Sequence, residues 1–105
     1  MIKKIMWLCY EFTIHHPDTI FEGIGGVYMF CGINEANEWV PLYVGQAPSL
    51  AGILDDNDIW LEAEELGATH VLVRTSIVPE HRDQVERRLI DAYQPFLNAQ
   101  QLMRA

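Results

Sequence analysis

Residues 25–45 constrain the fold most, because their composition predicts two β-strands joined by a short polar turn. Residues 27–33 form one apolar and aromatic run, and residues 39–44 form a second. Two such runs on either side of a short loop are typical of a β-hairpin. Asn34 and Asn37 lie in the loop, where asparagine adopts turn conformations and bonds its own backbone. We therefore expect the chain to be organised around this antiparallel pair of strands.

Each predicted strand contains one tyrosine close to a glycine. Tyr28 follows Gly26 by two residues, and Tyr43 precedes Gly45 by two residues. Two interpretations are open. Either the paired strands bring both hydroxyls into one small polar site, or both rings are amphipathic aromatics at the edge of the core.

The rest of the chain predicts further strands and helices around this hairpin. The expected strands are residues 5–14 and 69–75, and the expected helices are residues 48–54, 59–66 and 80–94. A chain of 105 residues is long enough for one domain with one core. The prediction is a single α+β domain over residues 1–105, with a small three-stranded antiparallel sheet, flanking helices and one extra N-terminal strand.

Charge is distributed unevenly along the chain, whose net charge is −8. Residues 1–66 contain 2 basic and 11 acidic residues, whereas residues 67–105 contain 5 basic and 4 acidic residues. Proteins that grip phosphates present lysine and arginine instead, so this balance counts against binding of free nucleic acid. An acidic surface favours a protein partner with a basic surface, or it serves only to keep the protein dissolved.

The two cysteines, Cys9 and Cys31, lack the spacing of a metal site or a redox motif. We expect both to be reduced, buried thiols of a cytoplasmic protein, and a disulfide between them is the alternative. No apolar run reaches the ~18 to 20 residues that a membrane span needs. The short apolar run near the N-terminus is not followed by the cleavage site of a signal peptide.

His15 and His16 precede Pro17, which lacks a backbone donor and favours a turn. Imidazole is a common metal ligand, so the pair is a candidate site. Adjacent side chains in an extended segment point in opposite directions, however, so we do not expect these two histidines to share an ion.

An acidic residue lies on the apolar face of the predicted helix over residues 80–94. At about 100° per residue, the apolar stripe from Val85 to Tyr93 includes Glu86. A carboxylate directed inward is costly unless it is paired or holds a metal ion. Arg82 lies one turn earlier and is spaced to pair with Glu86 along the helix. The two open interpretations are this ion pair and a metal-binding or acid–base carboxylate.

The chain resembles the GIY-YIG nuclease family in four short motifs, whose order and spacing fit and which cover about residues 25–100. The motifs are Gly26-Val27-Tyr28, Tyr43-Val44-Gly45, Val85-Glu86-Arg87-Arg88-Leu89-Ile90 and Pro95-Phe96-Leu97-Asn98. Each motif alone is weak, whereas four in order with a helical glutamate are fairly specific. The resemblance implies a three-stranded antiparallel sheet flanked by helices.

The resemblance also implies a hydrolytic mechanism and a role for each matching residue. One of Tyr28 and Tyr43, supported by the other, would help to activate a water molecule. Glu86 would hold one divalent ion, Mg²⁺ or Mn²⁺, and Asn98 would support the site. A metal ion neutralises developing negative charge while an oriented base prepares the water.

One part of the family pattern is missing. The resemblance implies a phosphate-steadying arginine near position 53 and a histidine near position 57, where this chain has Ile53 and Asn57. Three aspartates lie between residues 55 and 58. Deleting such an electrostatic group commonly costs about 100- to 1000-fold in rate. Arg82, beside Glu86, is the candidate replacement.

Three functions are compatible with these features. The first is a degenerate nuclease domain that acts as a small acidic binding or inhibitory protein toward a nucleic-acid-handling partner, for example a defence system that a mobile element must block. The second is an active metal-dependent DNA endonuclease, in which Arg82 or an arginine of a partner completes the site. The third is an accessory domain in which Tyr28, Tyr43 and Glu86 matter only for stability.

Overall fold

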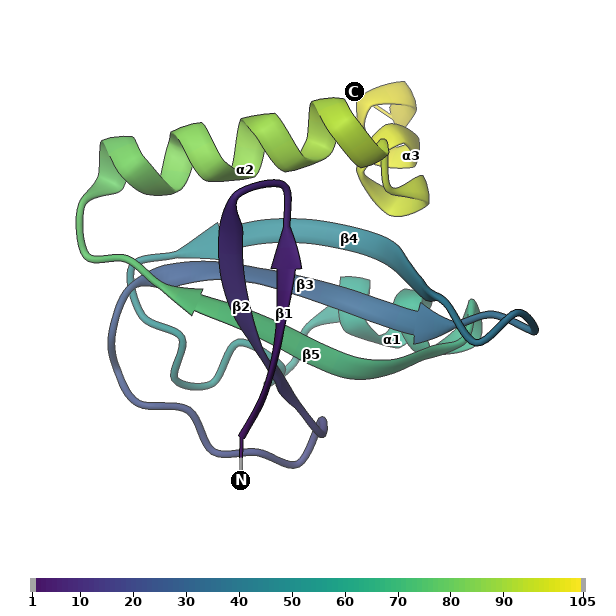
Figure 1. Ribbon diagram of the computed structural model, residues 1–105, viewed down its shortest axis with the longest axis horizontal. Coiled ribbons are helices and arrows are strands. Elements are labelled where there is room, and N and C mark those ends of the chain that lie inside the picture. Colours follow the sequence, from purple (N-terminus) through teal and green to yellow (C-terminus); the bar gives the residue numbers. More distant parts are fainter. Residues whose placement is uncertain (1, 105) are drawn as a thin grey trace.

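The structure is a computed structural model and describes residues 2–104. Over these residues the chain has an α+β fold with a five-stranded antiparallel sheet and three helices (Figure 1). The strand order is β1-β2-β5-β3-β4, so β1 and β4 are the edges of the sheet. The elements in chain order are β1 (Lys3–Trp7), β2 (Tyr10–His15), β3 (Gly26–Ile33), β4 (Trp39–Ala47), α1 (Asp58–Glu65), β5 (Ala68–Thr75), α2 (Pro79–Tyr93) and α3 (Phe96–Arg104).

The N-terminal part is a hairpin of two strands, where the sequence predicted one strand over residues 5–14. Trp7 pairs with Tyr10, so Leu8 and Cys9 form a two-residue turn. Leu8 has a φ of 57°, which is uncommon for a residue with a bulky side chain. The prediction was wrong because this turn contains none of the glycine, asparagine or proline residues that signal a turn in a sequence. The sheet therefore has five strands, rather than three and one extra strand.

The predicted central hairpin is confirmed, because β3 pairs antiparallel with β4 along its whole length. In the connecting loop, the Asn34 N–H donates to the Glu38 carbonyl at 2.9 Å, and the Glu38 N–H donates to Asn34 Oδ1 at 2.9 Å. Strand β5 pairs antiparallel with the other side of β3. The strand that contains Tyr28 is thus enclosed between two others, while the strand that contains Tyr43 is at an edge.

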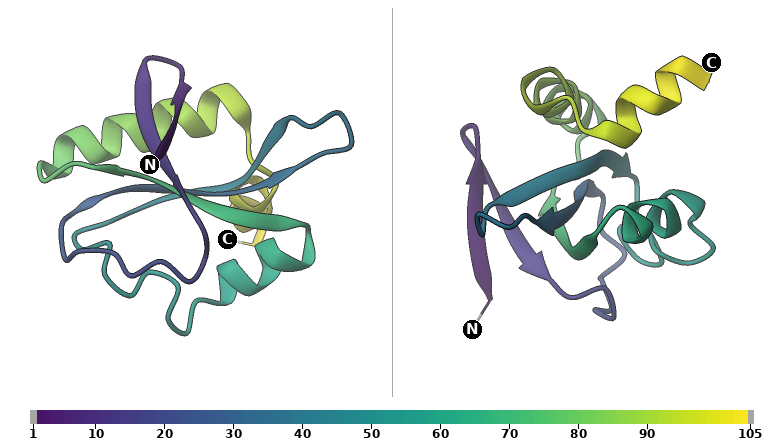
Figure 2. Two further views of the ribbon diagram at one scale, coloured as in Figure 1. Left: turned by 60° about the horizontal axis from the view of Figure 1, so that its bottom comes forward. Right: turned by 90° about the vertical axis from the view of Figure 1, so that its right-hand side faces the viewer.

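Helices cover both faces of the sheet (Figure 2). Val85 and Leu89 of α2 pack into a core on one face that includes Met29. Trp60 of α1 packs into a second core on the other face, which includes Phe30. Met29 and Phe30 join different cores because successive side chains of a strand point to opposite faces.

The boundaries of α1 and α2 agree with the sequence signals. Helix α1 begins after Asn57, whose Oδ1 accepts the Trp60 N–H at 3.0 Å. Gly67 follows the end of α1 with a φ of 105°, the conformation that glycine adopts after a helix. Helix α2 begins at Pro79, which is favoured in a first turn because its missing N–H is not needed there.

Two segments differ from the prediction. Residues 48–57 form bends and turns rather than a helix over residues 48–54. Gly52 and Asp56 have φ values of 71° and 50° there, which interrupt a right-handed helix. After Pro95 the chain forms α3, a helix that the sequence analysis did not predict, and the Pro95 carbonyl accepts the Ala99 N–H at 3.2 Å.

Both cysteines are free thiols, but only one of them is buried. Cys31 is enclosed in the core, and burial raises its pKa to about 12. Cys9 is exposed, contrary to expectation, because it lies in the turn between β1 and β2. Within residues 2–104, no helix has both the length and the apolar character that a membrane crossing requires.

Candidate functional site

The structure brings Tyr28 and Tyr43 together on neighbouring strands. Tyr28 lies opposite Gly45 in the strand register, and Tyr43 lies opposite Phe30. The ring centres of the two tyrosines are 6.2 Å apart. A Cβ at Gly45 would lie 2.6 Å from the Tyr28 hydroxyl oxygen, so only glycine leaves room for the phenol there. The Tyr28 ring therefore lies directly over the backbone of β4.

Both phenols carry their protons at neutral pH. Burial, followed by the charges of Tyr43 and Glu86, raises the pKa of Tyr28 to about 12. Burial, followed by the charge of Glu86, also raises the pKa of Tyr43 above its usual value. Both side chains are consequently hydrogen-bond donors, and the Glu86 carboxylate is close enough to act on both.

Helix α2 brings charged residues to the end of β4. Arg82 and Glu86 are four residues apart and therefore share one face of the helix. Arg82 is only 7% exposed, and Glu86 is partly buried. Both side chains thus point toward the sheet, within the face that the helical periodicity indicated.

Gln46 connects β4 to α2, and the sequence analysis did not single it out. Its amide nitrogen donates to Glu86 Oε1 at 3.0 Å and also to Asp83 Oδ1. Its amide oxygen accepts a hydrogen bond from Arg82 Nε at 3.3 Å. One neutral side chain thus binds three charged residues of a single helix. The available signal was its position directly after the second tyrosine motif, where a polar residue interrupts an apolar strand.

Arg82 is fastened into the fold through further contacts. Its Nη1 donates to the Ser76 carbonyl at 3.1 Å. A Cβ at Gly25 would lie 2.7 Å from the same Nη1, so the guanidinium rests against the chain just before β3. The suggested Arg82–Glu86 ion pair does not occur among the salt bridges of the described residues. Gln46 lies between the two side chains and bonds to both.

Asn98 supports the edge strand from α3. Its Oδ1 accepts the Val44 N–H at 2.8 Å, and its Nδ2 donates to the Val44 carbonyl at 2.9 Å. An edge strand presents backbone groups that have no partner strand, and Asn98 satisfies one pair of them. Because Val44 follows Tyr43, this contact holds the backbone next to that tyrosine.

The segment with the missing arginine has a different character. Ile53 lies in a turn and is partly buried, and no arginine or lysine occurs in the sequence between Lys4 and Arg74. Asp55 and Asp56 are exposed beside it. The end of β4 therefore faces a polar network on α2, whereas the chain that follows β4 is apolar and acidic.

The two carboxylates that bond to Gln46 have the donor chemistry of a hard-cation site. Mg²⁺ and Mn²⁺ prefer oxygen ligands, and Mg²⁺ is often held by one or two carboxylates and several waters. Glu86 and Asp83 fit that description. Across residues 2–104, no group of three or more histidine, cysteine or acidic side chains is arranged to hold a metal ion. An ion at Glu86 would therefore take most of its ligands from water or substrate.

Two neutral phenols thus lie on the α1 side of β4, and a partly buried carboxylate and an amide lie on its α2 side. Such groups orient a water molecule or an oxyanion by hydrogen bonding. Comparisons with protein-family models, curated proteins and solved structures found no match for this chain.

Proposed function

We propose that this chain is a divergent GIY-YIG nuclease-like domain that works by binding rather than by cutting. In this role it is a small acidic protein that recognises the basic surface of a nucleic-acid-handling partner, as an inhibitor of a defence complex would. The observation that carries the proposal is the segment over residues 50–58. Where the resemblance implies a phosphate-binding arginine, this segment has Ile53 among exposed aspartates.

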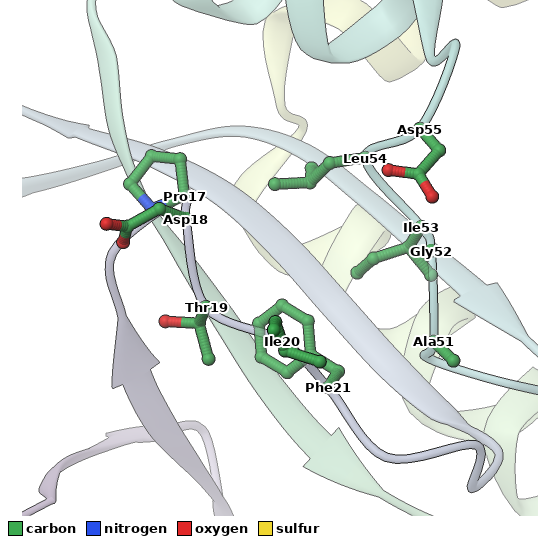
Figure 3. A pocket seen from close by; sticks show the side chains of 10 residues that line it. All are labelled: Pro17, Asp18, Thr19, Ile20, Phe21, Ala51, Gly52, Ile53, Leu54 and Asp55. Carbon is green, nitrogen blue, oxygen red and sulfur yellow. The ribbon is translucent and has the colours of Figure 1, made fainter.

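A hollow beside that segment offers a place for a basic side chain. It measures about 330 Å³ and lies between the loop after β2 and the turns before α1 (Figure 3). Asp18 and Asp55 lie on opposite sides of it, with Phe21 and Leu54 between them. Ile20, which also lines the hollow, is 96% exposed. Lysine and arginine pack their methylene stems on apolar surface while their charged ends remain outside, so this lining suits them.

The contacts of Arg82 favour impaired cleavage. An arginine that steadies a phosphate presents free donors to the phosphate oxygens. The guanidinium of Arg82 is instead enclosed and bonded to Gln46 and to the Ser76 carbonyl. Moving it to a phosphate would break both contacts, so we assign Arg82 to holding α2 against the sheet.

The binding function can be tested by capturing nucleic-acid-handling complexes from the host with charge-reversed proteins. Asp18→Lys/Asp55→Lys reverses two charges at the hollow, and Glu35→Lys/Glu38→Lys reverses the same number in the loop between β3 and β4. We expect wild type and the loop variant to capture the same complex, and the hollow variant to lose it. Quantitative mass spectrometry followed by titration with the purified complex provides the measurement.

Two outcomes would count against this function. Equal loss of capture in both double variants would mean that net charge, rather than the hollow, attracts the partner. Failure of the wild-type protein to capture any nucleic-acid-handling complex would contradict the binding role itself. Circular dichroism of all three proteins controls for unfolding.

An active endonuclease is the second candidate, and the proximity of Tyr28, Tyr43 and Glu86 favours it. Glu86 would hold Mg²⁺ or Mn²⁺, with Asp83 as an additional oxygen donor, and the ion would neutralise charge on the phosphate. Because the pKa of Tyr28 is about 12, its phenol donates a hydrogen bond at neutral pH and orients the attacking water. Arg82 or an arginine from a partner would supply the remaining positive charge.

Cleavage of supercoiled plasmid distinguishes the two functions. Wild type, Glu86→Ala and the matched control Glu80→Ala, which alters an exposed residue of the same helix, are compared at high concentration with Mg²⁺ and then Mn²⁺. The binding function predicts no nicking by any of the three. Nicking by wild type and Glu80→Ala that is absent in Glu86→Ala would establish the enzyme instead.

A further inference from the structure

Two histidines from distant parts of the sequence meet where β2 ends beside β5. His15, the last residue of β2, pairs with Val71 in the antiparallel register. Continuing that register by one residue places His16 opposite His70. The ring centres of His16 and His70 are 5.2 Å apart. The two imidazoles are therefore cross-strand neighbours. In the strand order they lie at β2 and β5, and β3 separates them from the edge strand β4.

The His70 ring is held in place by two neighbouring side chains. Its ring packs edge-on against Trp39 with 5.1 Å between ring centres, and its Nδ1 lies 2.8 Å from Thr69 Oγ1. When Nδ1 donates its proton to that hydroxyl, Nε2 keeps a free lone pair.

The histidine pair borders a cavity of about 310 Å³. His15 lines the same cavity, but its Nε2 is 2.7 Å from Thr13 Oγ1 and its ring packs against Phe21. Lys3 also lines the cavity, and its described lining residues include no carboxylate. The cavity is thus lined by imidazoles and the Thr19 hydroxyl rather than by carboxylates such as Glu86 and Asp83.

We propose that His16 and His70 form a two-imidazole site for a first-row transition-metal ion such as Zn²⁺, Ni²⁺ or Cu²⁺. With metal–nitrogen bonds of about 2.0–2.1 Å, two imidazoles on one tetrahedral ion have ring centres roughly 5 Å apart. The observed 5.2 Å agrees with this spacing. Imidazole nitrogen suits these ions, whereas Mg²⁺ prefers oxygen. Water occupies the remaining positions, and the ion ties the loop after β2 to β5.

Isothermal titration calorimetry of ZnCl₂ and NiCl₂ into the full chain near neutral pH tests the site. We expect wild type to bind one ion, and binding to weaken by about 10-fold or more in His16→Gln and in His70→Phe. The phenylalanine keeps a ring against Trp39. The control is His81→Gln, which removes an exposed histidine of α2 and should bind like wild type. MgCl₂ should not bind to the pair.

Lys3→Gln separates a metal site from an anion site. Removal of the lysine charge strengthens binding of a cation and weakens binding of phosphate, so we expect tighter Zn²⁺ binding in this variant. Weaker Zn²⁺ binding in Lys3→Gln would overturn the proposal. Unchanged binding in both His16→Gln and His70→Phe would also overturn it. Because His16 is exposed, His16→Gln should melt at the wild-type temperature, which separates loss of the ligand from loss of the fold.

Discussion

Helices α1 and α2 cover opposite faces of one sheet, but different chemistry attaches them. Helix α2 is bonded through Gln46, which contacts three of its charged residues, and through the Ser76 carbonyl, which accepts from Arg82. Helix α1 is attached through apolar rings, with Trp60 edge-on against Phe30 at 5.0 Å. Hydrogen bonds are directional, whereas apolar burial is not. The α2 face therefore specifies one arrangement of polar groups, while the α1 face specifies mainly volume.

This difference explains how one chain combines a hydrogen-bonded polar network on α2 with exposed aspartates before α1. Glu86 and Gln46 belong to the α2 side of the fold, whereas Tyr28 packs on the α1 side. Asp55, Asp56 and Asp58 belong to the α1 side, where side chains outside the core vary at little cost in stability. We infer that the two faces of the sheet place separate requirements on their side chains. The following four experiments examine these requirements.

The largest effect is expected for Arg82→Ala. The change leaves the Ser76 carbonyl and Gln46 Oε1 without their donor and empties a buried position. We expect the free energy of unfolding to fall by roughly 2–4 kcal/mol in urea titrations followed by circular dichroism. Arg87→Ala, which alters an exposed residue of the same helix, should stay within about 0.5 kcal/mol of wild type. Equal losses would mean that Arg82 does not fasten α2.

The next effect compares two asparagines that bond to the backbone, Asn98 beside β4 and Asn57 at the start of α1. Asn98→Ala removes two buried hydrogen bonds to Val44, so we expect a loss of about 2 kcal/mol. Asn57→Ala removes the cap of α1, and we expect a loss of about 1 kcal/mol. Thermal unfolding of both variants measures the difference. A larger loss for Asn57→Ala would reverse the comparison.

Alkaline pH should destabilise the protein through Cys31. Its thiol ionises near pH 9.0 in the unfolded chain but near pH 12 in the folded protein. Between these values the unfolded chain binds fewer protons, so stability falls as pH rises, by about 1.4 kcal/mol at pH 10. That loss lowers the melting temperature by about 6–11 °C. In Cys31→Ala the decline in stability should begin at a higher pH, near the usual pKa of tyrosine. An unchanged pH profile would mean that another group causes the decline.

The smallest effect concerns the contact between the two sides at Tyr28. Glu86→Gln removes a negative charge that helps to raise the pKa of Tyr28, so that pKa should fall by a fraction of a unit. It should remain above 10.0, because burial is the larger cause. The shift in the pKa of Tyr28 is measured by ultraviolet titration of phenolate formation in two proteins. These are Tyr43→Phe and the double variant Tyr43→Phe/Glu86→Gln. If Glu80→Gln produces the same shift, the effect comes from general charge rather than from Glu86.

Periodicity predicted those parts of the fold in which local sequence and tertiary packing agree. The hairpin of β3 and β4, strand β5 and helix α2 follow from apolar runs and from signals such as Pro79 and Gly67. The turn at Leu8 and the irregular segment over residues 48–57 did not follow. Both segments depend on positive φ values, which occur at a leucine in the first and at an aspartate in the second. Neither residue type predicts such a conformation from the sequence.

By itself, the sequence determined which residues are candidates for chemistry: Tyr28, Tyr43, Arg82, Glu86 and Asn98 each stood out by motif or by periodicity. Only the tertiary structure decided their partners. Arg82 and Glu86 are separated by Gln46 rather than paired, and His16 meets His70 rather than His15. The physical reason is that a side chain's partner depends on strand register and on the position of a helix over the sheet. Both are set by contacts between residues far apart in the chain, which local patterns do not encode.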